Sequence, residues 1–379
     1  MKQPKEIKRL ILFYFSGTGN AKAVSNWIAE IFLENSIPTE IIEIKKGQKP
    51  DVSSINTDTL IGFCYPTHGF NAPPIVLSYI ARFPKSVKAN FFVLNTQAGM
   101  KLYKIFMPGL SGIALFLPLL ILRIKGYRCT NIRPMDMPSN WISLHPGLKD
   151  KVTQSIISRC KRISRRFAQK LIEGKTDYRW LALFPLDIIV APIAIPYYYI
   201  GRFMIAKTFF ASGKCNSCGL CARNCPIKAI EMRDNRPYWK FNCESCMRCM
   251  NTCQRKAIET AHGFSFLIWW AAFFILPLLV LNLMINSKAI DVNLANNLSI
   301  IYTALQITIG FIVVSLGYRA LHFLLRFKFI NLIITYTSLT KLPFWRRYKA
   351  SIKLVTQNPE LTSGSNIQGK GEQTGQKTN

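Results

Sequence analysis

Residues 9–35 read RLILFYFSGTGNAKAVSNWIAEIFLEN, and this stretch decides the fold of the first half of the chain. Residues 9–15 form an apolar run that ends at a turn containing serine and glycine, as a buried strand does. Residues 21–35 then show the apolar spacing of a helix. A buried strand that leads through a short turn into a helix predicts the start of a parallel βαβ unit.

Strand and helix patterns continue to alternate through the first 175 residues. We predict further strands at TEIIEI (39–44), TLIGFCYP (59–66), NFFVLNTQ (90–97) and KGYRCTNIRPMDMP (125–138). We expect the uncharged residues 105–122 to form a helix after the fourth strand and to face lipid in part. Residues 147–174 predict a long basic amphipathic helix. This alternation predicts an α/β doubly wound parallel sheet.

The turn after the first strand, SGTGN, has the composition of an anion site. Two glycines let the backbone approach an anion, and the hydroxyls of Ser16 and Thr18 add donors. The following helix N-terminus adds favourable partial charge. The sequence therefore predicts a phosphate site, and an ordinary strand–helix turn is the alternative.

Eight of the eleven cysteines lie between Cys215 and Cys253, in the runs CNSCGLCARNCP and CESCMRCMNTC. Both runs have the form C-x2-C-x2-C-x3-C, in which the fourth thiolate ligates the other of two cubane clusters. A zinc ribbon, which takes paired C-x2-C knuckles, or a set of disulfides is the alternative. The predicted ligands are Cys215, Cys218, Cys221 and Cys253 for one cluster, and Cys243, Cys246, Cys249 and Cys225 for the second.

Two uncharged stretches, Phe264 to Ser287 and Val292 to Tyr318, are each long enough to cross a bilayer. Buried helices of a soluble protein are the alternative. Basic residues crowd the outer ends of the pair, so we expect a hairpin in the bacterial inner (cytoplasmic) membrane, with both termini and the redox domains cytoplasmic. Trp180 to Gly201, which contains Asp187 and three prolines, is predicted to lie at the membrane interface.

The chain of 379 residues has a formal net charge of +30, most of which the positive-inside bias explains. We expect membrane lipid and an acidic redox protein or membrane redox partner to bind it, and no nucleic acid, because no reading motif is present. The four histidines are dispersed, and we find no Ser-His-Asp, paired-carboxylate or Walker pattern. No catalytic residue is assigned, and an electron carrier is favoured over a substrate-specific oxidoreductase.

The segment FSGTGN resembles the FMN phosphate loop of flavodoxins, although Ala21 stands where flavodoxins usually have threonine. The resemblance implies that CYPTHGFNAPP (64–74) and NTQAGM (95–100) flank a flavin ring, and that Tyr65, His68 and Phe70 could stack on it. The implied FMN contacts are Ser16, Gly17, Thr18, Gly19, Asn20, Tyr65, His68, Gly69, Thr96, Gln97 and Gly99.

Residues 212–260 resemble bacterial ferredoxins, and residues 8–260 together resemble EFR1-type proteins, which join a flavodoxin-like domain to a two-cluster ferredoxin. The resemblance implies two [4Fe–4S] clusters, with FMN as a cofactor left open. The expected fold is an α/β flavodoxin-like sheet, a small α+β ferredoxin domain and two transmembrane helices. The expected units are a flavodoxin-like domain (1–175), an apolar interfacial linker (176–211), a ferredoxin domain (212–260), a transmembrane hairpin (261–325), a basic-aromatic juxtamembrane segment (326–357) and a disordered tail (358–379).

We therefore expect a membrane-anchored electron-transfer protein that works between a soluble carrier and a membrane-associated acceptor. Two alternatives stay open. One is a flavin-dependent reductase of a small substrate, with the clusters as electron supply and His68 as proton donor. The other is a docking module whose flavodoxin-like domain no longer binds FMN.

Overall fold

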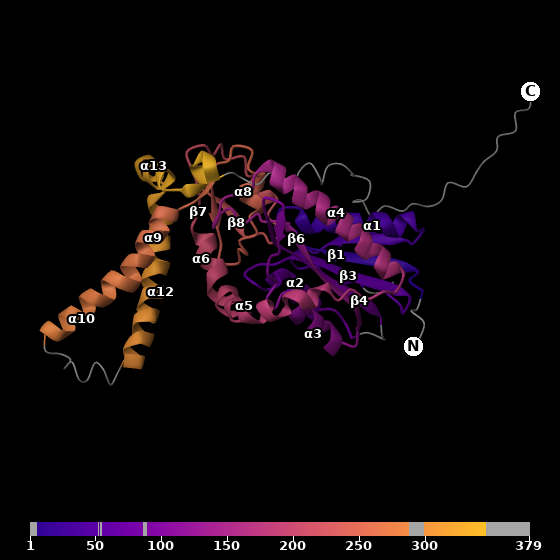
Figure 1. Cartoon of the computed structure of the whole chain (residues 1–379). Helices are drawn as coiled ribbons and strands as arrows, with labels where there is room; N and C mark the ends of the chain where they lie inside the picture. The colour runs from indigo at the N-terminus through magenta and orange to yellow at the C-terminus, as the bar shows by residue number, and fades with distance from the viewer. Residues whose placement is uncertain (1–5, 52, 54, 86–88, 288–298, 346–379) are drawn as a thin grey trace, which may run out of the picture.

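The computed structural model describes residues 6–51, 53, 55–85, 89–287 and 299–345. A sheet of parallel strands fills the first half of the chain (Figure 1). Its parallel strands lie in the order β2-β1-β3-β4-β6, with bounds β1 (Arg9–Tyr14), β2 (Thr39–Glu43), β3 (Thr59–Pro66), β4 (Asn90–Leu102) and β6 (Arg128–Pro138). This is the doubly wound order of flavodoxin-like folds. The predicted parallel sheet and flavodoxin-like domain are confirmed by this order.

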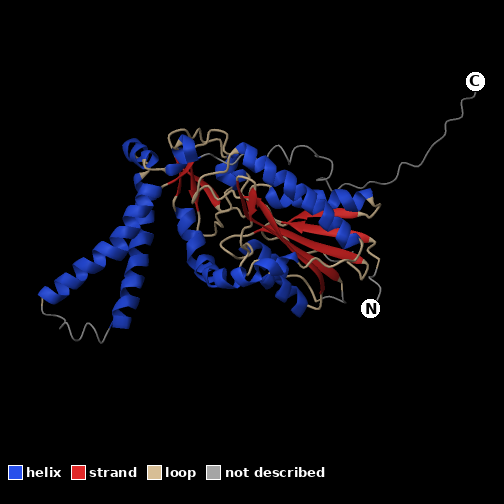
Figure 2. Cartoon of the chain, viewed as in Figure 1, coloured by secondary structure: helices blue, strands red, loops and turns tan. Residues whose placement is uncertain are grey.

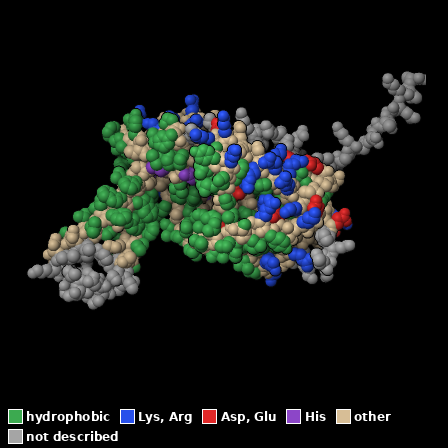
Figure 3. Space-filling model, viewed as in Figure 1, with side chains coloured by type: hydrophobic (Ala, Val, Ile, Leu, Met, Phe, Trp, Pro, Cys, Tyr) green, Lys and Arg blue, Asp and Glu red, His purple; other side chains and the backbone are tan. Residues whose placement is uncertain are grey.

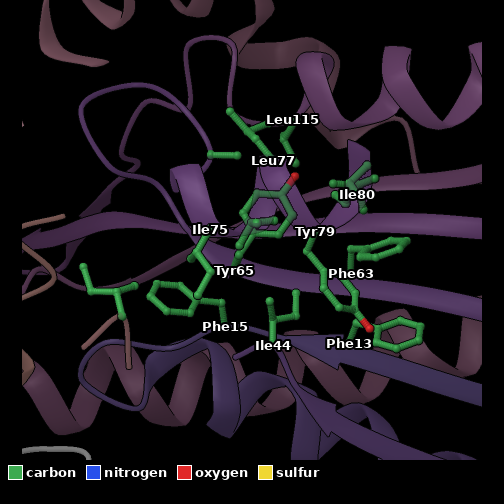
Figure 4. Close-up of a cluster of buried hydrophobic side chains, with 14 of the residues drawn as sticks. Phe13, Phe15, Ile44, Phe63, Tyr65, Ile75, Leu77, Tyr79, Ile80 and Leu115 are labelled. Atoms are coloured by element: carbon green, nitrogen blue, oxygen red, sulfur yellow. The ribbon is translucent and has the colours of Figure 1, made fainter. Parts of the chain in front are cut away.

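Helices cover both faces of the sheet (Figure 2). One face carries α1 (Asn20–Glu34) and the long basic α4 (Asp150–Ile172), and the other carries α2 (Pro74–Ala81) and α3 (Phe116–Ile124). The core on the second face is rich in aromatic rings, among them Phe13, Phe63 and Tyr65 (Figure 4). That core continues without a break into the cysteine-rich region, where it includes Trp239 and Met250. The two regions therefore share one hydrophobic core.

The stretch 105–122 is not one helix, contrary to our expectation. The strand β4 runs on to Leu102 and turns back as the short antiparallel β5 (Ile105–Met107). Helix α3 begins only at Phe116. The residues of NTQAGM, expected in a loop, belong to β4, because β6 pairs with them as far as Gly99. Pairing with a long neighbouring strand has extended β4 beyond its apolar run.

The cysteine-rich region is a small α+β unit of two antiparallel strand pairs. Its elements are β7 (Phe209–Ala211), α7 (Leu220–Arg223), β8 (Ile230–Arg233), β9 (Arg236–Trp239), α8 (Arg248–Thr252) and β10 (Ile258–Thr260). Strand β7 pairs with β10, and β8 pairs with β9. The pair Ile230–Trp239 matches the pair Ile258–Ala211 after a shift of 28 residues, so the unit is an internal duplication.

A bent helical segment joins the sheet to this unit and lies along the body of the molecule (Figure 1). It consists of η1 (Arg179–Leu183), α5 (Phe184–Pro196), the π-helical η2 (Tyr197–Gly201) and α6 (Arg202–Lys207). Asp187, inside α5, is buried, and its carboxylate accepts the backbone N–H groups of Ser111 (2.6 Å) and Gly112 (2.9 Å). This fixes the helix to the sheet domain.

A helical hairpin projects from the cysteine-rich unit, and hydrophobic side chains cover much of the face that Figure 3 shows. Its arms are α9 (His262–Trp270) with η3 (Ala271–Ile275) and α10 (Leu276–Asn286), and α12 (Ser299–Leu324). By length and composition, three described helical stretches could cross a membrane: Arg179–Lys207, His262–Val280 and Thr303–Leu324. The stretch Arg179–Lys207, which we expected at the membrane interface, meets the same criteria as the two arms of the hairpin, so the expectation of exactly two spans stays a prediction.

The segment after the hairpin returns to the body of the protein. It contains α13 (Lys328–Tyr336), η4 (Leu339–Lys341) and η5 (Pro343–Trp345). Trp345 is buried, and its indole N–H donates to the Ile142 carbonyl at 2.7 Å. The hydroxyl of Thr340 hydrogen-bonds the buried Glu259. The rest of the predicted juxtamembrane segment, from residue 346, and the predicted tail lie outside the described residues.

Candidate metal centre

The first predicted cysteine quartet lines one cavity. Cys215, Cys218, Cys221 and Cys253 all face a space of about 160 Å³ that is closed by the side chains of Met232, Pro237 and Ile258, among others. Cys253 comes from the second cysteine run, so the chain crosses over between its two halves at this point. The structure thus brings together the four residues that the sequence assigned to one cluster.

The second quartet is more deeply buried. Cys225, Cys243, Cys246 and Cys249 lie close enough for their charges to interact. Burial raises the pKa of the Cys246 thiol to about 11 and that of Cys249 well above its ordinary value, and repulsion between neighbouring thiolates adds to the rise at Cys249. Thiolates that are withdrawn from water and close to one another need a compensating positive charge to remain ionised.

The backbone around each quartet repeats after 28 residues. The left-handed φ angles of Ser217 (59°) and Gly219 (70°) match those of Ser245 (51°) and Met247 (60°). The sulfur of Cys225 accepts the Ala229 N–H at 3.2 Å, and the sulfur of Cys253 accepts the Ala257 N–H at 3.3 Å. A left-handed conformation at Met247 costs energy for a residue with a side chain, so the fold holds this loop shape against its local preference.

Each quartet offers four thiols, which is the donor set that a cubane iron–sulfur cluster takes. All eleven cysteines are free thiols, so the structure contains no disulfide framework. Among the described residues, no group of three or more His, Cys, Asp or Glu side chains converges closely enough to hold a single metal ion.

The sheet domain packs directly against the second quartet. A Cβ placed on Gly17 would lie 2.4 Å from the Cys246 carbonyl oxygen, so only glycine permits this approach. Arg248 donates to the carbonyl oxygens of Ser16 (2.5 Å) and Gly17 (3.0 Å), and pairs with Glu43 at 3.2 Å. In the first cysteine run the equivalent position is Leu220. Arg248 also donates to the Asn224 carbonyl in the first cysteine run at 3.3 Å, so it joins the sheet domain to both cysteine runs.

The predicted phosphate loop, Ser16–Asn20, is almost closed to solvent. Ser16, Thr18 and Asn20 expose 3%, 5% and 8% of their surface. Their polar groups are used inside the protein: the Ser16 hydroxyl accepts the Gly19 N–H, Thr18 bonds Asn140, and the Asn20 amide donates to the Pro138 carbonyl. In this arrangement the loop residues do not fit an FMN phosphate, because Cys246 and Asn140 cover them.

The predicted flavin-ring contacts are also covered. Tyr65 lies in the core, where its hydroxyl donates to the Ala114 carbonyl, so it offers no face to a ligand (Figure 4). The ring of Tyr197 lies against Gly69, where an added Cβ would come within 2.1 Å of it. The buried Nδ1 of His68 has no hydrogen-bond partner among the described residues, and burial lowers the pKa of His68 to about 4. At neutral pH its imidazole is uncharged, so it lacks the imidazolium proton that a general acid would give.

The other implied contacts are bonded within the sheet domain. Thr96 and Gln97 are buried on β4, and the Gln97 amide exchanges hydrogen bonds with Ser111 and Asp136. Gly99 lies against Asp136, where a Cβ would come within 2.7 Å of the Asp136 carbonyl oxygen.

Sequence reasoning missed three residues that shape this region. They are Arg248, Tyr197 and Glu244, whose carboxylate accepts the Ile75 N–H at 3.0 Å across the domain boundary. Burial raises the pKa of Glu244 to about 7. Alignment of the two cysteine runs could have singled out Arg248, since Leu220 occupies its counterpart. Nothing in the local sequence marks Tyr197.

No protein-family model and no curated protein matches the chain. Solved structures that resemble part of it include Flavodoxin 1 from Bacillus cereus, which is 14% identical over 42% of this chain and 97% of its own, with a TM-score of 0.29. A flavodoxin from the domain Archaea is 14% identical over 43% of this chain and 97% of its own, with a TM-score of 0.24. A flavo-di-iron protein from Thermotoga maritima is 12% identical over 44% of this chain and 37% of its own, with a TM-score of 0.26. The flavodoxin-like assignment of residues 9–172 rests on the strand order 2-1-3-4 followed by β6, not on these scores.

Proposed function

We propose that this chain is a membrane-anchored iron–sulfur electron-transfer protein with two [4Fe–4S] clusters. The observation that carries the proposal is the interleaving of the quartets: Cys253 faces the cavity of the first run, and Cys225 lies with the second. Such exchange of the fourth ligand is typical of two-cluster ferredoxins.

The protein's own residues would hold the sulfur ligands and control access of water. Bound clusters of this type accept and release single electrons. The second quartet is shielded by Trp239, Met247 and Met250, all at most 2% exposed. Burial is one of the factors that set the potential of a cluster.

The first quartet is the more open of the two, and this supports it as the side on which a soluble partner docks. Cys218 is exposed. Arg255 lines the same cavity, and the exposed Lys214 and Arg223 lie close by in the sequence. A basic rim of this kind attracts a partner with an acidic surface and raises the rate of encounter.

The sheet domain acts, in this proposal, as a docked cover for the second quartet. The burial of the phosphate loop and the contacts of Arg248 favour this function over flavin chemistry. The proposal therefore combines an electron-transfer protein with a flavodoxin-like domain that docks and does not bind FMN. A flavin that binds this chain would require Cys246 and Asn140 to move away from the loop.

The hairpin supports anchoring, and it would place the cysteine-rich unit beside a bilayer. The proposed position is the cytoplasmic side of a bacterial inner membrane, with an acceptor in or on that membrane. The orientation rests on the basic residues outside the two spans and on the positive-inside rule.

The test is anaerobic purification of the full chain in mild detergent, followed by iron, sulfide and flavin analysis. We expect about eight irons per chain and substoichiometric flavin. Cys253→Ser should lower the iron content by about four per chain, because it removes one ligand of the first quartet. Cys129→Ser, which changes a cysteine outside the block, is the matched control. Equal iron in both variants would refute the ligand assignment, and one firmly bound flavin per chain would refute the docked-cover role.

A further inference from the structure

A second cavity lies at the foot of the hairpin, between α12 and the β8–β9 strand pair. Its volume is about 240 Å³. Four arginines line it, from two parts of the chain that lie far apart in sequence, together with one acidic residue: Arg233, Arg236, Arg319, Arg326 and Asp234. Four guanidinium groups around one acid give the cavity a strong positive potential.

Two of the arginines are held in place by the protein. Arg236 donates to the Ala211 carbonyl at 2.8 Å. The guanidinium of Arg233 lies 3.9 Å from the ring centre of Tyr238, which also lines the cavity. Guanidinium groups that are fixed before a ligand arrives lose little entropy on binding it.

The arginines that line the cavity outnumber the acidic side chains that pair with them. Arg326 pairs with Asp234 at 3.3 Å, and Arg233 pairs with Glu231 at 2.9 Å. Arg319 makes no ion pair or hydrogen bond with any residue that the structure describes, although it stands on α12 at the cavity wall. A flat guanidinium with free donors is suited to the oxygens of a phosphate group.

The walls of the cavity are apolar on the side of the hairpin. Phe210, Phe323 and Leu325 line it, and a small apolar space of about 30 Å³ adjoins it along α6 and α12. The two spaces share Tyr238, Arg319 and His322. A charged chamber that opens along a hydrophobic helix matches a ligand with an anionic head and an apolar continuation. The hydrophobic surface of the hairpin meets the body at this level (Figure 3).

We propose that this cavity binds a phosphate-bearing anion, and that Arg319 contacts it directly. The apolar wall and the position at the end of α12 point to the headgroup of an anionic phospholipid as the source. A soluble phosphate compound presents the same oxygens to the same arginines. Binding at this cavity does not require iron–sulfur clusters, so its test is independent of the test of the proposed function.

The test uses the full chain in neutral detergent and follows its thermal midpoint. The added probes are phosphatidylglycerol, phosphatidylcholine, inorganic phosphate, and sodium chloride at matched ionic strength. We expect phosphatidylglycerol to raise the midpoint in a saturable manner and phosphatidylcholine to leave it unchanged. Arg319→Gln should weaken the apparent affinity about tenfold, the effect of losing one charge-assisted contact.

The control is Arg162→Gln, which removes the same charge from an exposed position on α4, away from the cavity. It should bind phosphatidylglycerol as the unmodified protein does. A saturable shift with inorganic phosphate that competes with phosphatidylglycerol would support the site and assign a soluble source. Three results would overturn the proposal. They are equal midpoint shifts with both lipids, equal affinity of the two variants for phosphatidylglycerol, and no midpoint shift with phosphatidylglycerol or with inorganic phosphate.

Discussion

The contact between Gly17 and Cys246 gives the sharpest test of how the two domains fit together. A Cβ at residue 17 would lie 2.4 Å from the Cys246 carbonyl oxygen and 3.0 Å from its Cβ, whereas ordinary contacts begin near 3.4 Å. Gly17→Ala must therefore move the cysteine loop by about 1 Å, since neither partner atom is the end of a flexible side chain. No positive φ is involved, so alanine causes no backbone strain there.

Two costs contribute to the expected effect. Overpacking of this size costs about 1–3 kcal/mol. The movement also stretches the hydrogen bond from Arg248 to Gly17, now 3.0 Å, which adds about 1 kcal/mol. We expect a loss of about 2–4 kcal/mol in the free energy of unfolding. For a chain of this size that corresponds to a fall in the thermal midpoint of about 3–5 °C.

The assay is thermal unfolding of the full chain in detergent, followed by circular dichroism. Gly213→Ala is the matched control, because its Cβ would meet nothing within 4 Å and its φ is not positive. That variant should stay within about 0.5 kcal/mol of the unmodified protein. If both variants unfold alike, the sheet domain does not press on the second quartet. If Gly17→Ala instead abolishes bound flavin at unchanged stability, the loop is a phosphate cradle and the docked arrangement is wrong.

Three further predictions concern single side chains. Arg248→Gln should destabilise the protein by about 2–3 kcal/mol, because it removes charge-assisted bonds to two carbonyl groups of the phosphate loop; unchanged unfolding relative to Arg162→Gln would contradict this. Burial lowers the pKa of His68 from 6.5 to about 4, so the unfolded chain binds a proton more readily than the folded protein does. The free energy of unfolding is therefore unaffected by this group above pH 6.5. It should fall by about 2–3 kcal/mol as the pH drops from 6.5 toward 4. His68→Gln should flatten that part of the profile of thermal midpoint against pH, and His145→Gln should not; a profile that is equally steep in both variants would disprove the assignment. Gly310→Val should loosen the hairpin, because a Cβ at residue 310 would lie 2.6 Å from the Phe273 ring. Ala304→Val, at an exposed position of α12, should leave the hairpin unchanged. The measurement is the helical circular dichroism signal in detergent on heating, which should be lost at a lower temperature in Gly310→Val only.

The order of strands and helices in the first half followed from the sequence, because buried parallel strands are continuous apolar runs that differ from helix patterns. Residues 9–15 and 59–66 are examples, and both formed strands close to the expected bounds. The cysteine spacing grouped Cys215, Cys218 and Cys221 with Cys253, and these four line one cavity, while their role as cluster ligands stays a prediction. The stretch 105–122 was misjudged, since its composition suits a buried helix as well as a strand and a turn, and only pairing with β4 decided between them.

Contacts between residues far apart in the chain could not be predicted from the sequence. The loop Ser16–Asn20 has the residues of a phosphate site, and local chemistry alone favours that function. Whether the loop is open depends on Cys246 and Arg248, more than two hundred residues away, and on Asn140. Tyr197 covers Gly69 for the same reason, since the helix that carries it is fixed to the sheet domain through Asp187. The sequence by itself determined the strand order, because it follows from local apolar patterns, and tertiary packing decided which candidate surfaces were left exposed.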